Sequence, residues 1–222
     1  MTVAVTTTPL SQALRDETSR AHADAEGSDF MTRLMAGELS ARAVAALTGQ
    51  LWFVYEALER AVRAVAETPI AGAVADPWLE RRDALELDLA EMLGARWRDE
   101  VRILPATARY VARLESLDSP GAAPEIVAHH YVRYLGDISG GQVIAARLCA
   151  VYGVDPDALH FYDFTAIGKI PPYRTAYREA LDGLVLSDVQ RAGLIAEAQE
   201  AFAFNSGVFA ELSARFPAGG MS

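Results

Sequence analysis

Cysteine and lysine are nearly absent from this chain of 222 residues, which contains one cysteine, Cys149, and one lysine, Lys169. A single cysteine excludes an intrachain disulfide framework, an iron–sulfur cluster held by cysteines and a cysteine-rich zinc site. We expect Cys149 to act as a small buried hydrophobe, because it lies in an apolar segment. Lys and Arg together number 20 against 30 Asp and Glu, a formal net charge of −10. This balance disfavours general nucleic-acid binding and docking on anionic membranes.

Long apolar runs are also missing. No stretch approaches the roughly 20 apolar residues needed to span a bilayer, and the polar start does not read as a signal peptide. We therefore expect a cytoplasmic protein, with flexible ends at 1–9 and 217–222 around one domain at 10–216. With 51% hydrophobic and 23% charged residues, the composition is that of a globular protein.

The pattern of apolar residues is helical almost throughout, with steps of three and four and no β alternation. Ser11 is a candidate cap for the first helix, and 160–172 reads as irregular. No repeat or linker divides the chain, so one all-α domain is predicted. The expected helices cover 10–25, 30–36, 40–67, 78–92, 105–117, 124–152, 172–184 and 187–216.

The segment 124–152 is the sharpest feature, because it is long and apolar yet contains three glycines in its middle, Gly136, Gly140 and Gly141. Each glycine inside a helix costs about 1 kcal/mol relative to alanine, so a bend or loosened backbone is predicted. Gly136 and Gly140 share one face, where a flat ligand could approach the backbone. Close packing between helices explains the same glycines about equally well.

Charged residues near this segment have two interpretations each. Asp137, embedded in the apolar run, either pairs with an arginine such as Arg133 or positions water. From Lys169 to Arg178 there are three cations and no acid, with Arg174 and Arg178 four residues apart. This stretch suggests an anionic ligand, although a solvated helix face explains two arginines alone more simply.

The four histidines do not form a zinc motif. His22 lies four residues before Glu26, so the two share a helix face, and a carboxylate could orient the imidazole for iron or zinc. On spacing alone, an exposed salt bridge is the commoner explanation. His129 and His130 are adjacent and point to different faces, while His160 suits packing or capping. The sequence contains neither the short helical His–His spacing of a zinc pair nor a recurring Glu-x-x-His pair, so a carboxylate-bridged metal site is not expected.

Taken together, these segments resemble haem oxygenase, and the resemblance runs from Leu10 to about Phe216. It is most specific in Tyr131 to Leu148, whose core closely matches the family signature. The ends of the chain match too, and the lack of a membrane tail makes it similar to the soluble bacterial enzymes. The matching residues are Tyr134-Leu135-Gly136-Asp137-Ile138-Ser139-Gly140-Gly141-Gln142, Leu10-Ser11, His22-Ala23, Ala25-Glu26, Phe30-Met31, Tyr177-Arg178, Ala201-Phe202, Asn205 and Phe209.

The resemblance implies an all-α bundle with haem sandwiched between a proximal helix and a kinked distal helix. His22 would be the axial iron ligand, with Glu26 as its partner. Gly136 and Gly140 would lie against the porphyrin, and Asp137 would order a water network beside the bound dioxygen. The remaining cofactor-binding residues would be Arg15, Arg174 and Arg178 at the propionates, Tyr131 near a propionate or the distal network, Ser139 on the distal face, and Phe202.

The implied activity is oxidative cleavage of haem b, as both substrate and cofactor, by dioxygen and electrons. The products would be biliverdin, carbon monoxide and ferrous iron. A ferredoxin or flavodoxin with its reductase would donate the electrons, and the enzyme would be a monomer. A haem carrier or sensor of the same fold is the alternative, and it would not need the Asp137 network. A thiaminase-like bundle would require a reactive cysteine. A purely structural helical domain would leave the glycines unexplained.

Overall fold

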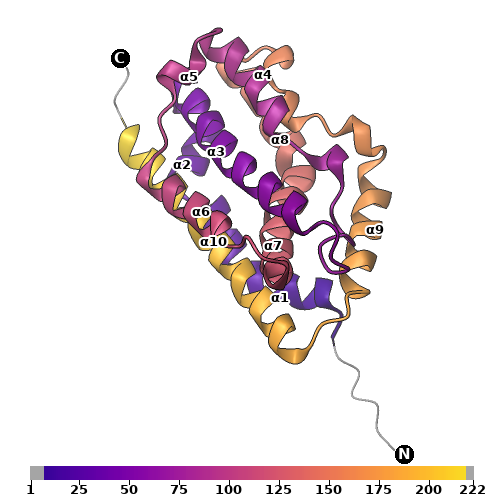
Figure 1. Cartoon of the computed structure of the whole chain (residues 1–222). Coiled ribbons are helices and arrows are strands. Elements are labelled where there is room, and N and C mark those ends of the chain that lie inside the picture. The colour runs from indigo at the N-terminus through magenta and orange to yellow at the C-terminus, as the bar shows by residue number, and fades with distance from the viewer. Residues whose placement is uncertain (1–7, 219–222) are drawn as a thin grey trace, which may run out of the picture.

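The computed structural model describes residues 8–218, and all the regular structure in this range is helical. Of the expected flexible ends at 1–9 and 217–222, residues 1–7 and 219–222 lie outside the described residues. The single all-α domain is confirmed (Figure 1). The α-helices are α1 (Leu10–Glu26), α2 (Asp29–Ala36), α3 (Ala41–Val65), α4 (Arg82–Leu93), α5 (Trp97–Glu100), α6 (Pro105–Glu115), α7 (Ala123–His130), α8 (Gly136–Tyr152), α9 (Ile170–Asp182) and α10 (Asp188–Arg215).

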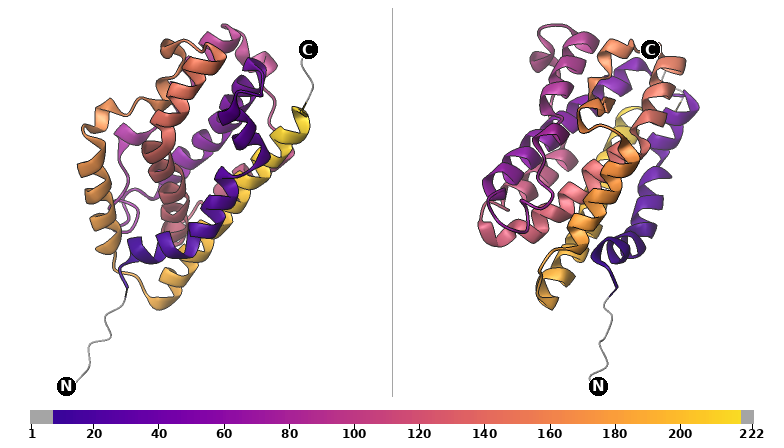
Figure 2. Two further views of the ribbon diagram at one scale, coloured as in Figure 1. Left: turned by 180° about the vertical axis from the view of Figure 1, so that it is seen from behind. Right: turned by 90° about the vertical axis from the view of Figure 1, so that its right-hand side faces the viewer.

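The core forms around two long helices. α10 runs the length of the bundle and packs against α1, α2, α6 and α7, as the views of Figure 2 show. α3 packs against α4, α6 and α7. Leu14, Phe30, Leu58 and Leu194 are fully buried at these contacts. Burying each such side chain contributes about 1.5–3 kcal/mol, and this apolar packing holds α1 in place along α10.

Several helix ends follow from local capping residues that the sequence shows. The Ser40 side chain accepts a hydrogen bond from the backbone of Ala43 at the start of α3, and Ser187 forms a capping box with Gln190 at the start of α10. Gly37 ends α2 at a φ of 84°, a conformation that glycine adopts without strain. The cap proposed for Ser11 is wrong. Ser11 lies inside the first turn of α1, and its hydroxyl donates instead to Asp182 at the end of α9.

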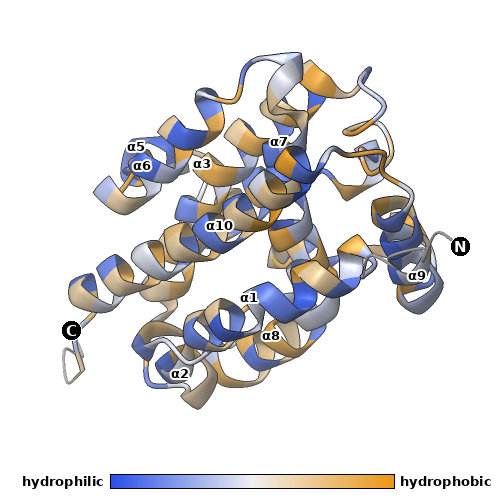
Figure 3. Ribbon diagram, turned by 90° about the horizontal axis from the view of Figure 1, so that it is seen from below, coloured by the Kyte–Doolittle hydropathy of each residue, from blue (hydrophilic) through white to orange (hydrophobic). Residues whose placement is uncertain are grey.

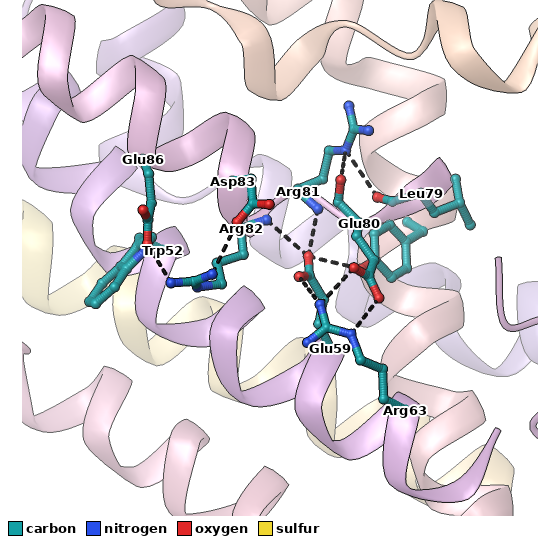
Figure 4. Close-up of polar contacts among 10 residues, drawn as sticks. Trp52, Glu59, Arg63, Leu79, Glu80, Arg81, Arg82, Asp83 and Glu86 are labelled. Carbon is teal, nitrogen blue, oxygen red and sulfur yellow. Dashed lines mark hydrogen bonds and ion pairs between the residues drawn. The ribbon is translucent and has the colours of Figure 1, made fainter. Parts of the chain in front are cut away.

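The helix expected over 78–92 starts four residues later than predicted. Pro77–Leu79 forms a 3-10 turn, and α4 begins only at Arg82. Its start is capped from another helix, because the carboxylate of Glu59 in α3 accepts hydrogen bonds from the backbone N–H groups of Arg81 and Arg82 (Figure 4). Arg63 also pairs with Glu59, at 3.4 Å. A cap that comes from a distant segment has no local sequence signal.

The expected long helix over 124–152 is three pieces. α7 ends at His130, a π-helical turn covers Tyr131–Leu135, and α8 starts at Gly136. The prediction of an irregular backbone is confirmed, but its location at the glycines is wrong. Gly136, Gly140 and Gly141 lie within α8, and none has a positive φ. The extra residue of the π turn lies upstream of them, in a segment rich in aromatic side chains.

The region before α9 also differs in detail. The segment predicted as irregular contains 3-10 turns at His160–Tyr162 and Thr165–Ile167. α9 starts at Ile170, two residues before the predicted start at Pro172, because prolines fit the first turn of a helix. In the part of the chain that the structure describes, no helix is long and apolar enough to cross a membrane.

Candidate functional site

A cleft of about 430 Å³ lies between α1 and the π turn with the start of α8, and α9 and α10 complete its walls. In the view from below, α1 lies in front of α8 in projection and α9 lies to one side of them (Figure 3). The cleft brings together eight of the predicted site residues from four parts of the chain. Its lining consists of Ser11, Arg15, Thr18, Ser19, His22, Tyr131, Val132, Leu135, Gly136, Ser139, Arg174, Arg178 and Phe202.

His22 faces the cleft from α1 with about half of its side chain exposed. Its Nδ1 lies 3.4 Å from a carboxylate oxygen of Glu26, one helical turn further on. The ring also meets the edge of Phe202, at 5.6 Å between centroids and an interplanar angle of 72°. With Nδ1 held by a carboxylate, Nε2 is the nitrogen that can bind a metal in the cleft. The predicted His22–Glu26 pair is thus present and oriented.

The opposite wall presents glycine backbone to the cleft. A Cβ atom built on Gly136 or on Gly140 would meet no atom within 4 Å, so packing in the protein does not require glycine at either position. Gly136 and Ser139 line the cleft, whereas Gly140 does not. Gly141 is different, because its Cβ would lie 3.0 Å from the ring of Tyr162. Gly141 therefore serves close packing, here against a 3-10 turn, whereas packing does not account for Gly136, which leaves its wall of the cleft open.

The cleft is positively charged. Three arginines line it, Arg15, Arg174 and Arg178, and no acidic residue does among the described residues. The Nε atom of Arg174 is buried and has no hydrogen-bond partner in the described part of the chain. An unsatisfied buried guanidinium N–H costs about 1–3 kcal/mol, which an anion in the cleft would remove. Lys169, the third cation of the predicted basic stretch, does not line the cleft.

Tyr131 lies beside two of these arginines. Burial raises the pKa of its phenol, while Arg178 and Arg15 oppose that shift. The phenol therefore remains protonated at neutral pH and can donate a hydrogen bond to an anion in the cleft. Tyr131 thus lines the cleft beside two of its arginines, and its predicted contact with a propionate or the distal network stays a prediction.

Asp137 is oriented away from the cleft lining, immediately behind Gly136. Its carboxylate pairs with Arg133 at 3.4 Å and accepts a hydrogen bond from the hydroxyl of Tyr55 in α3. Arg133 also donates to the side-chain oxygen of Asn205 in α10, at 3.0 Å. Burial raises the pKa of Asp137 well above its ordinary value. Of the two predicted roles, pairing with Arg133 is observed.

The other three histidines have structural partners. The imidazole of His129 contacts Glu197 at 2.8 Å, and that of His130 contacts the hydroxyl of Tyr177 at 2.7 Å. His160 lies 2.9 Å from Asp88, which also accepts the backbone N–H of His160, so the capping residue is Asp88 and His160 is its partner. Among residues 8–218, no group of three His, Cys, Asp or Glu side chains could hold a metal ion. Cys149 is half-buried rather than buried.

Some of the residues that line the cleft were not predicted from the sequence. Ser11, Thr18 and Ser19 share with Arg15 and His22 the face of α1 that turns to the cleft. Their spacing of three and four along the helix is the signal that could have found them. Val132 and Leu135 were missed because the π turn changes which residues share a face. Tyr55 gives no local signal, since it reaches Asp137 from another helix.

Known proteins resemble this chain over most of its length. The family model described as heme oxygenase matches residues 8–211. Heme oxygenase 1 of Synechocystis sp. is 34% identical over 204 residues, which cover 91% of this chain and 84% of that protein. A crystal structure of heme oxygenase-1 from Synechocystis in complex with heme matches with a TM-score of 0.89 and 32% identity, over 94% of each chain. Heme oxygenase-2 of the same organism, in complex with heme and NO, gives 0.87 and 29% identity over 94% of this chain and 86% of that one.

Proposed function

The chain belongs to the haem oxygenase family, and we propose that its cleft binds haem b as both substrate and cofactor. The enzyme cleaves haem with dioxygen and electrons to biliverdin, carbon monoxide and ferrous iron. One observation carries the assignment of the site: among residues 8–218, the cleft combines a single oriented histidine, an open glycine face and three arginines without an acid. Haem is flat and apolar, with two anionic propionates and one iron, so each feature matches a part of it.

His22 supplies the iron ligand in this proposal. Its Nε2 would bind the iron, while Glu26 at Nδ1 fixes the ring direction and makes the imidazole a stronger donor. The edge of Phe202 restricts rotation of the same ring. Iron needs no further protein ligand on this side, and the other three histidines are engaged elsewhere.

The glycine wall would let the ring approach the backbone of α8. Gly136 offers no side chain to the cleft, and Ser139 adds one small hydroxyl beside it. Gly140 shares the helix face of Gly136 and is proposed to serve the same approach. Arg15, Arg174, Arg178 and the Tyr131 hydroxyl would hold the propionates, and the buried Nε of Arg174 would gain a partner there.

Bound haem would supply both the iron that binds dioxygen and the porphyrin ring that is oxidised. The chain's part is to deliver protons and to exclude bulky groups. Asp137 has a carboxylate held by Tyr55 and Arg133 directly behind the cleft wall, so it can order water and pass a proton to oxygen chemistry in the cleft. Burial raises the pKa of Asp137, which favours the protonated carboxyl, the form that can give up a proton.

A haem carrier or sensor is distinguished by turnover. Haemin added to the protein should give a Soret band, and ascorbate or a reductase system in air should then convert that band to biliverdin absorption. A stable Soret band would favour the carrier, and no Soret band would exclude haem altogether. The ferredoxin or flavodoxin donor, the monomeric state and the cytoplasmic location stay predictions.

The ligand assignment is tested with His22→Ala. We expect this variant to keep part of its haem affinity, since the arginines and the apolar walls remain, and to lose turnover. Added imidazole should restore the ligand-dependent Soret position, which separates a lost ligand from a damaged fold. Turnover at the parent rate without imidazole would refute the assignment.

The proton-delivery role is tested with Asp137→Asn, which keeps the shape but not the charge. We expect normal haem binding, slower biliverdin formation and increased peroxidase-like oxidation of an added phenol by hydrogen peroxide. The matched variant Asp83→Asn alters an exposed carboxylate that also pairs with an arginine, Arg82 in α4, and does not line the cleft. Equal biliverdin rates for Asp137→Asn and the parent would show that Asp137 delivers no proton.

A further inference from the structure

A series of aromatic side chains runs through the protein behind the cleft wall. The rings of Tyr55 and Tyr134 are 5.5 Å apart between centroids, those of Tyr134 and His130 are 4.4 Å apart, and those of His130 and Tyr177 are 5.7 Å apart and stacked. Tyr173 follows one turn before Tyr177 on α9. These side chains come from α3, α7, the π turn and α9, so only the fold brings them together.

Every tyrosine hydroxyl in this series contacts a group that can accept its proton. Each acceptor belongs to a different segment of the chain. The hydroxyl of Tyr55 donates to Asp137, that of Tyr134 to Glu59 at 3.4 Å, that of Tyr177 contacts His130 Nδ1 at 2.7 Å, and that of Tyr173 donates to Asp76 at 2.7 Å.

The two ends of the series lie in different surroundings. The inner end, Tyr55, is fully buried and bonded to Asp137, whose neighbour Gly136 lines the cleft. The outer end, Tyr173, is half-buried and bonded to the half-buried Asp76. The series therefore connects the haem cleft to the protein surface.

We propose that Tyr55, Tyr134, Tyr177 and Tyr173 carry oxidising equivalents from the haem cleft to the surface, where a reductant in solution removes them. The series protects the protein and its haem when oxygen chemistry in the cleft produces hydrogen peroxide without opening the ring. The inference rests on the proposed binding of haem.

The chemistry balances one electron and one proton at a time. Hydrogen peroxide in the cleft takes up two electrons from the series and two protons from solvent, and it becomes two molecules of water. The series supplies the two electrons in two successive passes. In each pass Tyr55 gives up one electron while its phenol proton moves to Asp137, and it then recovers an electron from Tyr134 and the proton from Asp137. The electron deficiency moves outward until Tyr173 has lost an electron and passed its proton to Asp76. Ascorbate then gives one electron to Tyr173, which takes its proton back from Asp76, and ascorbate releases one proton to solvent. Over two passes one ascorbic acid becomes dehydroascorbic acid, and its two released protons balance the two taken up by the peroxide.

The local bases suit this transfer, because a phenol must lose its proton when it loses an electron. Burial raises the pKa of Asp137 and of Glu59, and both carboxylates are therefore stronger bases than exposed ones. Glu59 is fixed in place by the backbone of α4, as Figure 4 shows. Burial lowers the pKa of His130 to about 3, so its imidazole is neutral at pH 7 and its Nδ1 can accept the hydrogen bond of Tyr177. This imidazole is a weak base, but an oxidised phenol is a strong acid, so His130 needs to hold the proton only while Tyr177 is oxidised.

The test uses the full chain loaded with haem, hydrogen peroxide as the probe and rapid-freeze electron paramagnetic resonance. We expect a tyrosyl radical, identified by its change in hyperfine structure after ring-deuterated tyrosine is incorporated. Tyr173→Phe should move the radical inward to Tyr177, whose hydroxyl contacts the imidazole of His130 rather than a carboxylate, and should lengthen the life of the radical in ascorbate. Tyr177→Phe should lose the outer signal and show a severalfold increase in haem bleached per peroxide.

Tyr152→Phe is the matched control. The hydroxyl of Tyr152 donates to the backbone carbonyl of Leu34, which is no base, and the residue lies outside the aromatic series. This variant should keep the parent's radical and bleaching. Unchanged spectra and bleaching in both Tyr173→Phe and Tyr177→Phe, or no protein radical in a sample with a full Soret band, would overturn the proposal. A missing Soret band would instead contradict haem binding, so the two failures are distinguishable. Circular dichroism of each variant confirms that it is folded.

Discussion

Replacing Gly136 by alanine should stabilise the protein and impair its function at the same time. Gly136 is the first residue of α8 and has ordinary right-handed helical angles, φ −62° and ψ −51°. A Cβ atom at this position meets nothing within 4 Å, because the space beside it is the cleft. Packing within the protein therefore does not require glycine at this position, whereas a ligand bound in the cleft would.

The expected sizes follow from those two facts. An alanine in a helix is favoured over glycine by about 1 kcal/mol, which for a chain of this length raises the melting temperature by about 2–4 °C. The same methyl group protrudes into the haem site, where overpacking costs about 1–3 kcal/mol. Haem affinity should accordingly fall about 5- to 150-fold.

Two measurements on Gly136→Ala check this reasoning: thermal unfolding of the haem-free protein, and titration with haemin followed by the Soret band. Gly141→Ala is the internal control, since its methyl would press against Tyr162 at 3.0 Å inside the protein. We expect no rise in melting temperature for that variant, because the crowding offsets the gain in helix propensity. A lower melting temperature for Gly136→Ala, or parent haem affinity, would refute the argument.

Two further predictions concern stability. Burial opposes ionisation of Glu197, but hydrogen bonds from His129 and Arg113 outweigh it and lower its pKa to about 2. A lowered folded-state pKa stabilises the protein above about pH 4.5, and that stability is lost as pH falls through about 2. The lowered pKa of Glu197 contributes at most about 3 kcal/mol to the free energy of unfolding, and about 2 kcal/mol once solvent screening at the partly exposed Arg113 is included. Glu197→Gln should remove this part of the acid dependence in urea unfolding from pH 2 to 7, and an unchanged profile would contradict it. Ser187→Ala should lower the unfolding free energy by about 1 kcal/mol through loss of its capping box with Gln190, and an unaltered melting temperature would show that α10 does not depend on it.

Much of the fold could be predicted because its signals are local. Ser40, Ser187 and Gly37 mark helix ends through contacts within a few residues, and the structure confirms those ends. The start of α4 could not be found this way. It depends on a carboxylate of Glu59, which is 22 residues from Arg81 along the chain.

The site divides in the same way. His22 and Glu26 are one helical turn apart, so their contact could be read from spacing, and the resemblance to the family supplied the rest. The surroundings of Asp137 were only half predictable. Arg133 is four residues away on the same segment, whereas Tyr55 and Asn205 arrive from α3 and α10. Sequence spacing reveals partners on one helix and misses those brought by packing.

The π turn at Tyr131–Leu135 gives the chain a change of phase between α7 and α8. One extra residue rotates everything after it by about 100° relative to an uninterrupted α-helix. The buried histidines of α7 and Gly136 of α8 therefore face two directions that one uninterrupted α-helix could not give to both. Deleting a single residue within 131–135 would change no downstream side chain but would rotate all of them about the helix axis. Gly136 would turn away from the haem, and a different face of α8 would lie beside the ring. The number of residues in this turn is therefore as much a determinant of the site as the residues themselves.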